Sequence, residues 1–176
     1  MTSVSRVLLA LGSNVGDRFA HLIEAVELIS VHIAVKQTSG VYETAPMYVT
    51  DQPDFLNAAL CGETKLGPLH LLRVLKGIEA EMGRPSGRRY GPREIDIDLI
   101  AYGSVRYRYI EAGQTILETP HPRVAERRFV LEPLADVAPE FILPGIGRVR
   151  ELLKRTEEQS DCVRKVDGVL PVHGHG

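Results

Sequence analysis

The sequence predicts an α+β fold in which two helices cover one face of an antiparallel sheet. Apolar or alternating segments typical of strands occur four times within residues 7–100, and two segments with helical apolar spacing separate them. At 176 residues the chain is long enough for one domain with a core and too short for two comfortable ones. We therefore expect a single domain over residues 1–168.

The first half of the chain supplies the first strand, the first helix and the second strand. Residues 7–11 are a short apolar run that predicts a buried strand. After an N-cap at Asp17, apolar residues at helical spacing predict an amphipathic helix over residues 19–29. Residues 31–42 are rich in β-branched side chains and predict a strand, whereas residues 44–53 contain two prolines and predict a loop.

The next segments complete a βαββαβ order. Residues 54–64 predict a third strand, and Pro68 begins a second helix that ends near Gly83. Residues 95–100 alternate between apolar and acidic side chains and predict a fourth strand. This order is that of a ferredoxin-like fold, whose two helices leave the other sheet face open. We expect the open face to carry the site.

Beyond Gly103 the pattern predicts a C-terminal extension. Residues 107–117 are expected to form a hairpin, residues 122–132 a helix and residues 149–155 a short surface helix. The glycine-rich segment 169–176 is expected to be an unstructured tail.

Composition limits the function classes. A formal charge of −2 and a pI near 6.3 argue against a general nucleic-acid binder. The absence of a membrane-length apolar run and of a secretion signal predicts a cytoplasmic protein with no membrane partner. Cys61 and Cys162 lack the spacing of a zinc site or a disulfide framework. No coiled-coil heptad is visible, so we expect a monomer.

A reversal of charge is the strongest chemical signal. Residues 84–93 carry arginines and no acid, and acidic residues follow at once. On a strand, period two puts Asp96 and Asp98 on one face, about 7 Å apart or less, where they can bind hard cations. The alternative interpretation is a solvated strand face whose acids pair with the arginines.

The arginine-rich loop strengthens the interpretation as a metal site. A polyphosphate brings negative charge to Mg²⁺ and needs guanidinium groups on the oxygens that the metal does not cover. Gly83, Gly87 and Gly91 would let this loop close over a nucleotide. Two alternatives remain open: a ferredoxin-like binding module for RNA or a small ligand, and nucleotidyl transfer at the same acidic pair.

Three further residues are weaker candidates when taken singly. His121 lies between two prolines and could donate to a phosphate or cap a helix. Glu79 follows a core position on the second helix and alone suggests a solvated acid. Asn57 lies among apolar residues, where its amide could pair with a heterocycle or with backbone.

Several segments in order resemble the 6-hydroxymethyl-7,8-dihydropterin pyrophosphokinase family, folate-pathway enzymes that make AMP and the pterin diphosphate. The most specific segment is residues 89–100, RYGPREIDIDLI. The supporting segments are LGSN at 11–14, DQPDFLNAA at 51–59, Ile78-Glu79 followed by Gly83-Arg84, and PHPR at 120–123 leading to Arg127 and Phe129. The resemblance spans residues 7–144.

The resemblance implies a role for each matching residue. Asp96 and Asp98 would bind two Mg²⁺ ions that bridge the ATP phosphates, with Asp96 also near the substrate hydroxymethyl group. The phosphate contacts would come from Arg84, Arg93, His121 and Arg127, with Glu79 near the nucleotide. The catalytic residues would be Arg84, Arg93, Asp96 and Asp98. The pterin slot would be formed by Thr44, Pro46, Met47, Phe55, Asn57 and Phe129, with Phe55 and Phe129 sandwiching the ring.

Some positions differ from the commonest family pattern. Tyr90 stands where tryptophan is frequent, Ala45 where a second proline is frequent, and Pro122 where tyrosine is frequent. Residues 85–88 differ in length and charge. These differences bear on loop closure and the adenine contact rather than on the reaction class.

Overall fold

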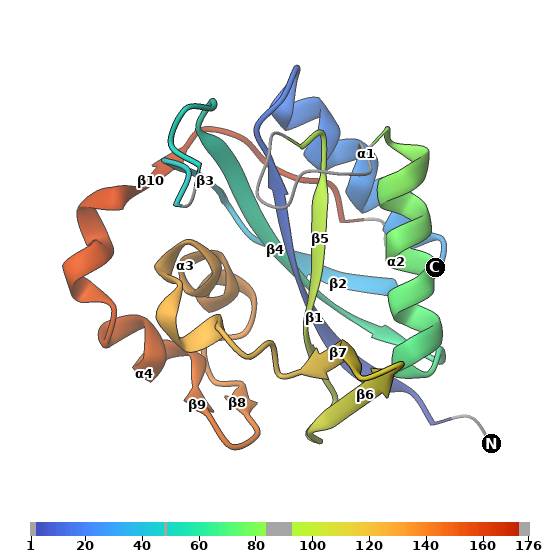
Figure 1. The fold of residues 1–176 in the computed structure, drawn as a ribbon. Coiled ribbons are helices and arrows are strands. Elements are labelled where there is room, and N and C mark those ends of the chain that lie inside the picture. Colours follow the sequence, from blue (N-terminus) through green and yellow to red (C-terminus); the bar gives the residue numbers. More distant parts are fainter. Residues whose placement is uncertain (1–2, 48, 84–92, 173–176) are drawn as a thin grey trace.

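The structure, a computed structural model, describes residues 3–47, 49–83 and 93–172. Within this part of the chain the main sheet has six strands, with all neighbouring pairs antiparallel. Its order is β10-β3-β4-β1-β5, and β2 also pairs with β4 (Figure 1). The strands of this sheet are β1 (Ser5–Ser13), β2 (Ala34–Thr38), β3 (Val41–Thr44), β4 (Phe55–Thr64), β5 (Asp96–Tyr102) and β10 (Val163–Val166).

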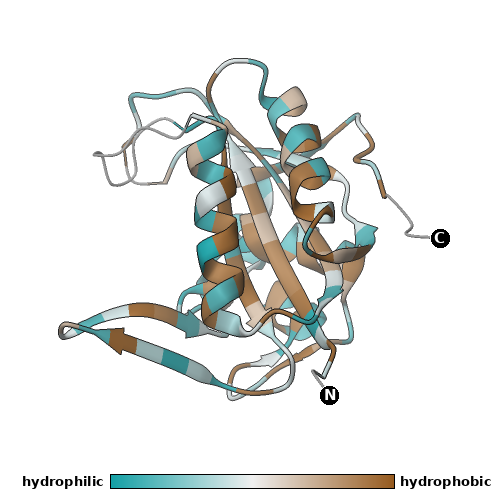
Figure 2. Cartoon of the chain, turned by 90° about the vertical axis from the view of Figure 1, so that its right-hand side faces the viewer, coloured by the Kyte–Doolittle hydropathy of each residue, from teal (hydrophilic) through white to brown (hydrophobic). Residues whose placement is uncertain are grey.

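Two helices cover one face of the sheet, as predicted. They are α1 (Arg18–Ser30) and α2 (Pro68–Glu81). The Asp17 side chain caps α1 by accepting a hydrogen bond from the Ala20 N–H at 3.1 Å. Leu22 of α1 and Leu75 of α2 are fully buried against the sheet. Figure 2 looks onto this layer and shows hydrophobic and hydrophilic residues alternating along both helices, as amphipathic packing requires.

The second face is not open along its whole length, which corrects one expectation. The C-terminal extension packs on it through α3 (Arg128–Val137) and α4 (Val149–Lys154) (Figure 1). Leu8 and Ala59 of the sheet meet Leu131 of α3 in a second apolar cluster. The fold class is that predicted, but the extension adds a third layer.

The predicted strand over residues 31–42 is divided into β2 and β3. The break occurs at Ser39, whose backbone N–H donates to the Ala59 carbonyl oxygen at 2.9 Å. Its hydroxyl accepts the Ala59 N–H at 2.7 Å, in place of a backbone carbonyl. The ladder is therefore interrupted there, and the chain resumes as β3, one residue beyond Gly40.

The extension differs from its prediction in two places. The helix expected over residues 122–132 begins only at Arg128, because Arg127 has an extended backbone between α3 and the short 3-10 helix η1 (Val124–Glu126). The tail expected to be unstructured from Val169 needs a correction at Leu170, which is 2% exposed and belongs to the α1-side core. Residues 173–176 lie outside the described residues.

Smaller elements complete the chain. The predicted hairpin is confirmed as β6 and β7, and it projects from the body of the molecule (Figure 2). No helix among the described residues is long and apolar enough to cross a membrane. The remaining elements are β6 (Tyr107–Glu111), β7 (Gln114–Thr119), β8 (Ile142–Leu143), β9 (Gly147–Arg148) and the 3-10 helix η2 (Glu157–Cys162).

Candidate active site

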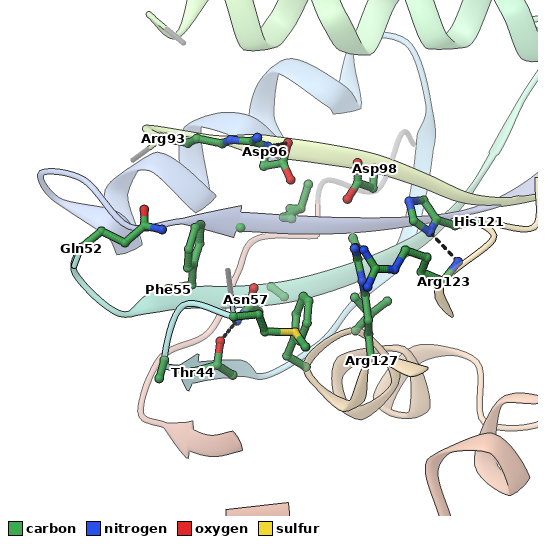
Figure 3. A pocket seen from close by; sticks show the side chains of 18 of the residues that line it. Thr44, Gln52, Phe55, Asn57, Arg93, Asp96, Asp98, His121, Arg123 and Arg127 are labelled. Atoms are coloured by element: carbon green, nitrogen blue, oxygen red, sulfur yellow. Dashed lines mark hydrogen bonds and ion pairs between the residues drawn. The ribbon is translucent and has the colours of Figure 1, made fainter. Parts of the chain in front are cut away.

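A cavity of about 570 Å³ lies on the second sheet face, beside the start of α3. Its walls come from β1, β4 and β5, from the loop after β3, and from the segment between β7 and α3. Figure 3 shows that it has two kinds of lining: acidic and basic side chains at one side, and Phe55, Asn57 and Thr44 at the other. Charged side chains and uncharged aromatic and amide side chains thus line the same cavity.

The acidic wall is formed by β5 through its pleat. Asp96 and Asp98 line the cavity, whereas Ile97 and Leu99 point into the α1/α2 core. Arg93 Nη1 donates to Asp96 Oδ1 at 2.8 Å. Burial, together with the charge of Asp96, raises the pKa of Asp98 to about 7. The predicted pairing of the two acids on one face is confirmed by this geometry.

The acidic pair fits a divalent cation that also has a ligand of its own. A cation between the carboxylates would offset the burial cost and the repulsion from Asp96 that together raise the pKa of Asp98. No cluster of three or more His, Cys, Asp or Glu suited to a metal occurs within the described residues. Mg²⁺ is commonly held by one or two carboxylates plus substrate phosphates. The arrangement therefore suits Mg²⁺ that arrives with a polyphosphate.

The basic wall faces these acids. Lys76, His121, Arg123 and Arg127 all line the cavity. His121 Nδ1 accepts the Arg123 backbone N–H at 3.2 Å, so the neutral ring carries its proton on Nε2. Burial and the charge of Arg127 lower the pKa of His121 to about 4. His121 is thus an uncharged hydrogen-bond donor at neutral pH.

The other side of the cavity is a slot for a flat polar group. Phe55, Phe129 and Met47 line it, and Asn57 is 6% exposed within it. Asn57 Nδ2 donates to Thr44 Oγ1 at 2.8 Å (Figure 3). This bond orients the Asn57 amide, whose oxygen lies near Gly12. A planar heterocycle with donors and acceptors on its edge suits this combination.

Asn14 joins the two sides. It is 1% exposed, and its backbone N–H donates to the Arg93 carbonyl at 3.0 Å. Its side-chain Oδ1 accepts the Arg93 N–H at 2.8 Å. Its Nδ2 donates to Gln52 Oε1 at 2.9 Å and to the Pro53 carbonyl at 3.0 Å. One buried amide therefore holds the segment at Arg93 and the loop before Phe55.

The cavity brings together most of the residues singled out from the sequence. Lining it are Thr44, Met47, Phe55, Asn57, Arg93, Asp96, Asp98, His121, Arg127 and Phe129. Pro46 and Glu79, both described, are not among the lining residues. Arg84 and Tyr90 lie within residues 84–92, outside the described residues, as does most of the loop expected to close, residues 83–93.

Glu79 corrects the expectation of a solvated acid. It is 2% exposed, and its Oε1 accepts the Ile97 N–H at 2.9 Å. Glu79 therefore supports β5 from the helix side, between the two aspartates along the strand. Its charge adds to the causes that raise the pKa of Asp98.

Sequence reasoning assigned no role to three polar or charged lining residues, namely Lys76, Gln52 and Arg123. Gln52 and Arg123 lie inside the segments that carried the resemblance. Lys76 precedes Glu79 by one helical turn, and its Nζ lies 3.5 Å from Glu79 Oε2. That spacing on one helix face was the available signal.

The comparisons with known proteins decide the family. Residues 8–139 match the family described as 7,8-dihydro-6-hydroxymethylpterin-pyrophosphokinase (HPPK). This chain belongs to the HPPK family. The 2-amino-4-hydroxy-6-hydroxymethyldihydropteridine pyrophosphokinase of Methylorubrum extorquens is 44% identical over 156 residues, covering 88% of this chain and 95% of that protein. The protein of the same name from Bacillus subtilis is 45% identical over 131 residues, 73% of this chain and 75% of that one.

Other HPPK relatives are much longer. The mitochondrial folate synthesis bifunctional protein of Pisum sativum is 50% identical over 139 residues, which are 77% of this chain and only 26% of that protein. Among solved structures, a Plasmodium falciparum HPPK-DHPS gives a TM-score of 0.74 at 16% identity, covering 93% of this chain and 47% of that one. At this identity the structural likeness supports the fold alone.

Proposed function

We propose that this chain transfers the pyrophosphoryl group of MgATP to the hydroxymethyl oxygen of 6-hydroxymethyl-7,8-dihydropterin, with release of AMP. The observation that carries the proposal is the single cavity in which the Asp96/Asp98 pair and the basic residues lie beside the Phe55–Asn57–Phe129 slot. Transfer requires donor and acceptor in one space, and the HPPK family name supports the pterin as acceptor and a pyrophosphoryl group as the group transferred.

The bonds follow from that pairing. The pterin oxygen attacks the β-phosphorus of ATP, and the bond from that phosphorus to the oxygen bridging the α-phosphate breaks. Two bound Mg²⁺ ions, held by Asp96 and Asp98, would neutralise charge on the attacking and leaving oxygens. The hydroxyl proton passes to solvent, and the chain needs no strong general base.

The protein's own groups supply positioning and hydrogen bonds. Arg93, Arg127 and the neutral His121 donate to phosphate oxygens, and Arg84 is proposed to do the same. Asn57, oriented by Thr44, reads the polar edge of the pterin, and Phe55 and Phe129 hold its faces. Lys76 adds a cation near Asp98. In this proposal the enzyme is a cytoplasmic monomer.

The test is an incubation of the purified protein with MgATP, with and without 6-hydroxymethyl-7,8-dihydropterin, followed by quantification of AMP. The proposal expects pterin-dependent AMP and the pterin diphosphate. Release of pyrophosphate would instead mean nucleotidyl transfer. If a folded, metal-replete protein releases neither, the cavity belongs to a binding module and the proposal is wrong.

A further inference from the structure

The C-terminal segment, residues 163–170, passes around an edge of the sheet. Before it, α4 packs on the α3 side, where Leu152 is buried in that cluster. Within it, β10 pairs with β3, with Val163 opposite Thr44. After β10 the chain reaches the α1 side, where Leu170 is buried in the other cluster (Figure 1). The segment thus joins the two outer layers across the β3 edge.

Specific contacts seat this segment on the α1 side. Gly168 has φ +147°, and a Cβ there would lie 2.4 Å from Phe19 Cε2. Phe19 is half-buried and packs against the core, so a Cβ at Gly168 would have to displace its ring from that packing. Thr38 Oγ1 donates to the Leu170 carbonyl oxygen at 3.1 Å. Gly168 is therefore a position where only glycine fits the close approach.

The strand with which this segment pairs, β3, contributes Thr44 to the wall of the slot. β3 has four residues, and its last, Thr44, accepts the hydrogen bond that orients Asn57. Glu43 receives hydrogen bonds from Arg18 and from Arg164 of β10, and these bonds lower the pKa of its carboxyl. Arg18 also donates to the Asp54 carbonyl at 3.0 Å, next to Phe55. The segment and the slot are thus linked through β3.

We propose that residues 163–170 position β3 and thereby set the affinity of the slot for the pterin. This inference rests on the proposed function. The segment lies beyond residues 8–139, the range matched to the HPPK family. None of residues 163–170, all of which the structure describes, lines the cavity. It acts as a positioning element and not as a ligand contact.

Fraying explains the expected effect. Without β10, the four residues of β3 would form a sheet edge with unpaired backbone groups and would open more often. Each opening separates Thr44 from Asn57, and the pterin binds only the fraction of molecules in which the pair is formed. The acidic wall is carried by β5, which lies at the opposite edge of the sheet. The pterin site weakens while the nucleotide site does not.

The test uses the full chain with Gly168→Ala, which introduces the clash with Phe19. The matched control is Gly113→Ala in the projecting hairpin, where φ is +75° and a Cβ meets nothing within 4 Å. A second, milder variant, Thr38→Val, removes the hydrogen bond to Leu170 and keeps the side-chain volume. We expect Gly168→Ala to raise KM for the pterin about tenfold and to leave KM for ATP and kcat unchanged. Thr38→Val should act in the same direction by less.

Comparing the change in KM for the pterin with the change in kcat separates an effect on positioning from general instability. Partial unfolding removes active molecules and lowers the apparent kcat, but it leaves KM of the surviving molecules unchanged. Hydrogen exchange of the β3 amides should also accelerate in Gly168→Ala and not in the control. If the wild type is active and both Gly168→Ala and Thr38→Val keep its KM for the pterin, this inference is wrong and the proposed function stands. A wild type that forms no AMP would overturn the proposed function and this inference with it.

Discussion

The Asp98 carboxyl lowers the stability of the fold when it ionises. Its pKa is raised to about 7 by burial and by Asp96, whereas the unfolded chain has the ordinary value of 3.8. Between these values the folded state binds more protons than the unfolded state, so the free energy of unfolding falls as pH rises. The contribution is fully present below pH 4 and is lost as pH passes through about 7.

The corresponding variant should gain stability and lose activity. Asp98→Asn removes the ionisation, so in the absence of metal we expect its melting temperature to exceed that of the wild type at pH 8. The difference should disappear near pH 4. The same variant should lose roughly 10²- to 10³-fold in turnover, the usual effect of removing one electrostatic contact. Calorimetry across this pH range with parallel AMP assays checks both parts; near-normal turnover would remove Asp98 from the metal site.

The pKa of His121 is shifted in the opposite direction, so its contribution to stability depends on pH in the opposite sense. Its pKa is lowered to about 4 from 6.5 by burial and by Arg127, so the unfolded chain binds the proton first as pH falls. The stability linked to His121 is therefore complete above pH 6.5 and decreases toward pH 4.

Replacing His121 should separate stability from the pH profile of activity. His121→Gln keeps a donor and removes the titration, so its urea midpoint should fall less between pH 7 and pH 4.5 than that of the wild type. Because the ring is already neutral, the variant's activity profile between pH 6 and 8 should be parallel to the wild-type profile. A profile that loses an inflection near pH 6.5 would mean that a charged His121 takes part in the reaction.

At the scale of elements, Asn14 connects the end of β1 to the segment at Arg93 and to the loop before Phe55. Asn14→Ala removes the side-chain hydrogen bonds that Asn14 makes with the Arg93 N–H, Gln52 Oε1 and the Pro53 carbonyl, in a position that is buried. Each net hydrogen bond contributes about 1 kcal/mol, and each buried polar group left without a partner costs about 1–3 kcal/mol. We therefore expect a loss of roughly 2–4 kcal/mol of unfolding free energy, measured by urea denaturation.

A second substitution at the same position distinguishes the two loops. Asn14→Asp keeps the acceptor for the Arg93 N–H but presents oxygen to Gln52 Oε1 and to the Pro53 carbonyl. It should raise KM for the pterin more than KM for ATP, while Asn14→Ala should raise both. Equal effects of Asp and Ala on the two constants would show that the contacts with Arg93 and with the Gln52 loop do not act separately.

The elements also show what sequence alone can predict. The alternation at Asp96–Asp98 and the apolar spacing of α1 and α2 are local patterns, and both appear in the structure. The β10–β3 pair is not local: Val163–Val166 contains two basic residues and no long apolar run, and its partner lies far away in the sequence. Glu79 was misjudged for the same reason, because its partner, the Ile97 N–H, belongs to another element.

For the whole molecule, the cavity depends on the sheet and on the layer that packs on its second face. β5 supplies the acids, the start of α3 supplies Phe129, and β3 with β4 supplies Thr44 and Asn57. The proposed cation site in this cavity has two protein carboxylates, Asp96 and Asp98, among the described residues. Metal binding should therefore depend on a ligand that brings phosphate oxygens.

This dependence predicts that metal and nucleotide stabilise the fold together. Mg²⁺ alone finds too few oxygens, and a nonhydrolysable ATP analogue alone brings negative charge to Asp96 and Asp98. With both present at about 100 times the dissociation constant, stabilisation should reach about 2.7 kcal/mol. In a chain of this length that corresponds to a melting-temperature rise of roughly 5–10 °C.

The double variant Asp96→Asn/Asp98→Asn should lose this synergy, because the metal then has no protein carboxylate. If the analogue without Mg²⁺ raised the wild-type melting temperature as much, the acidic pair would not be a metal site.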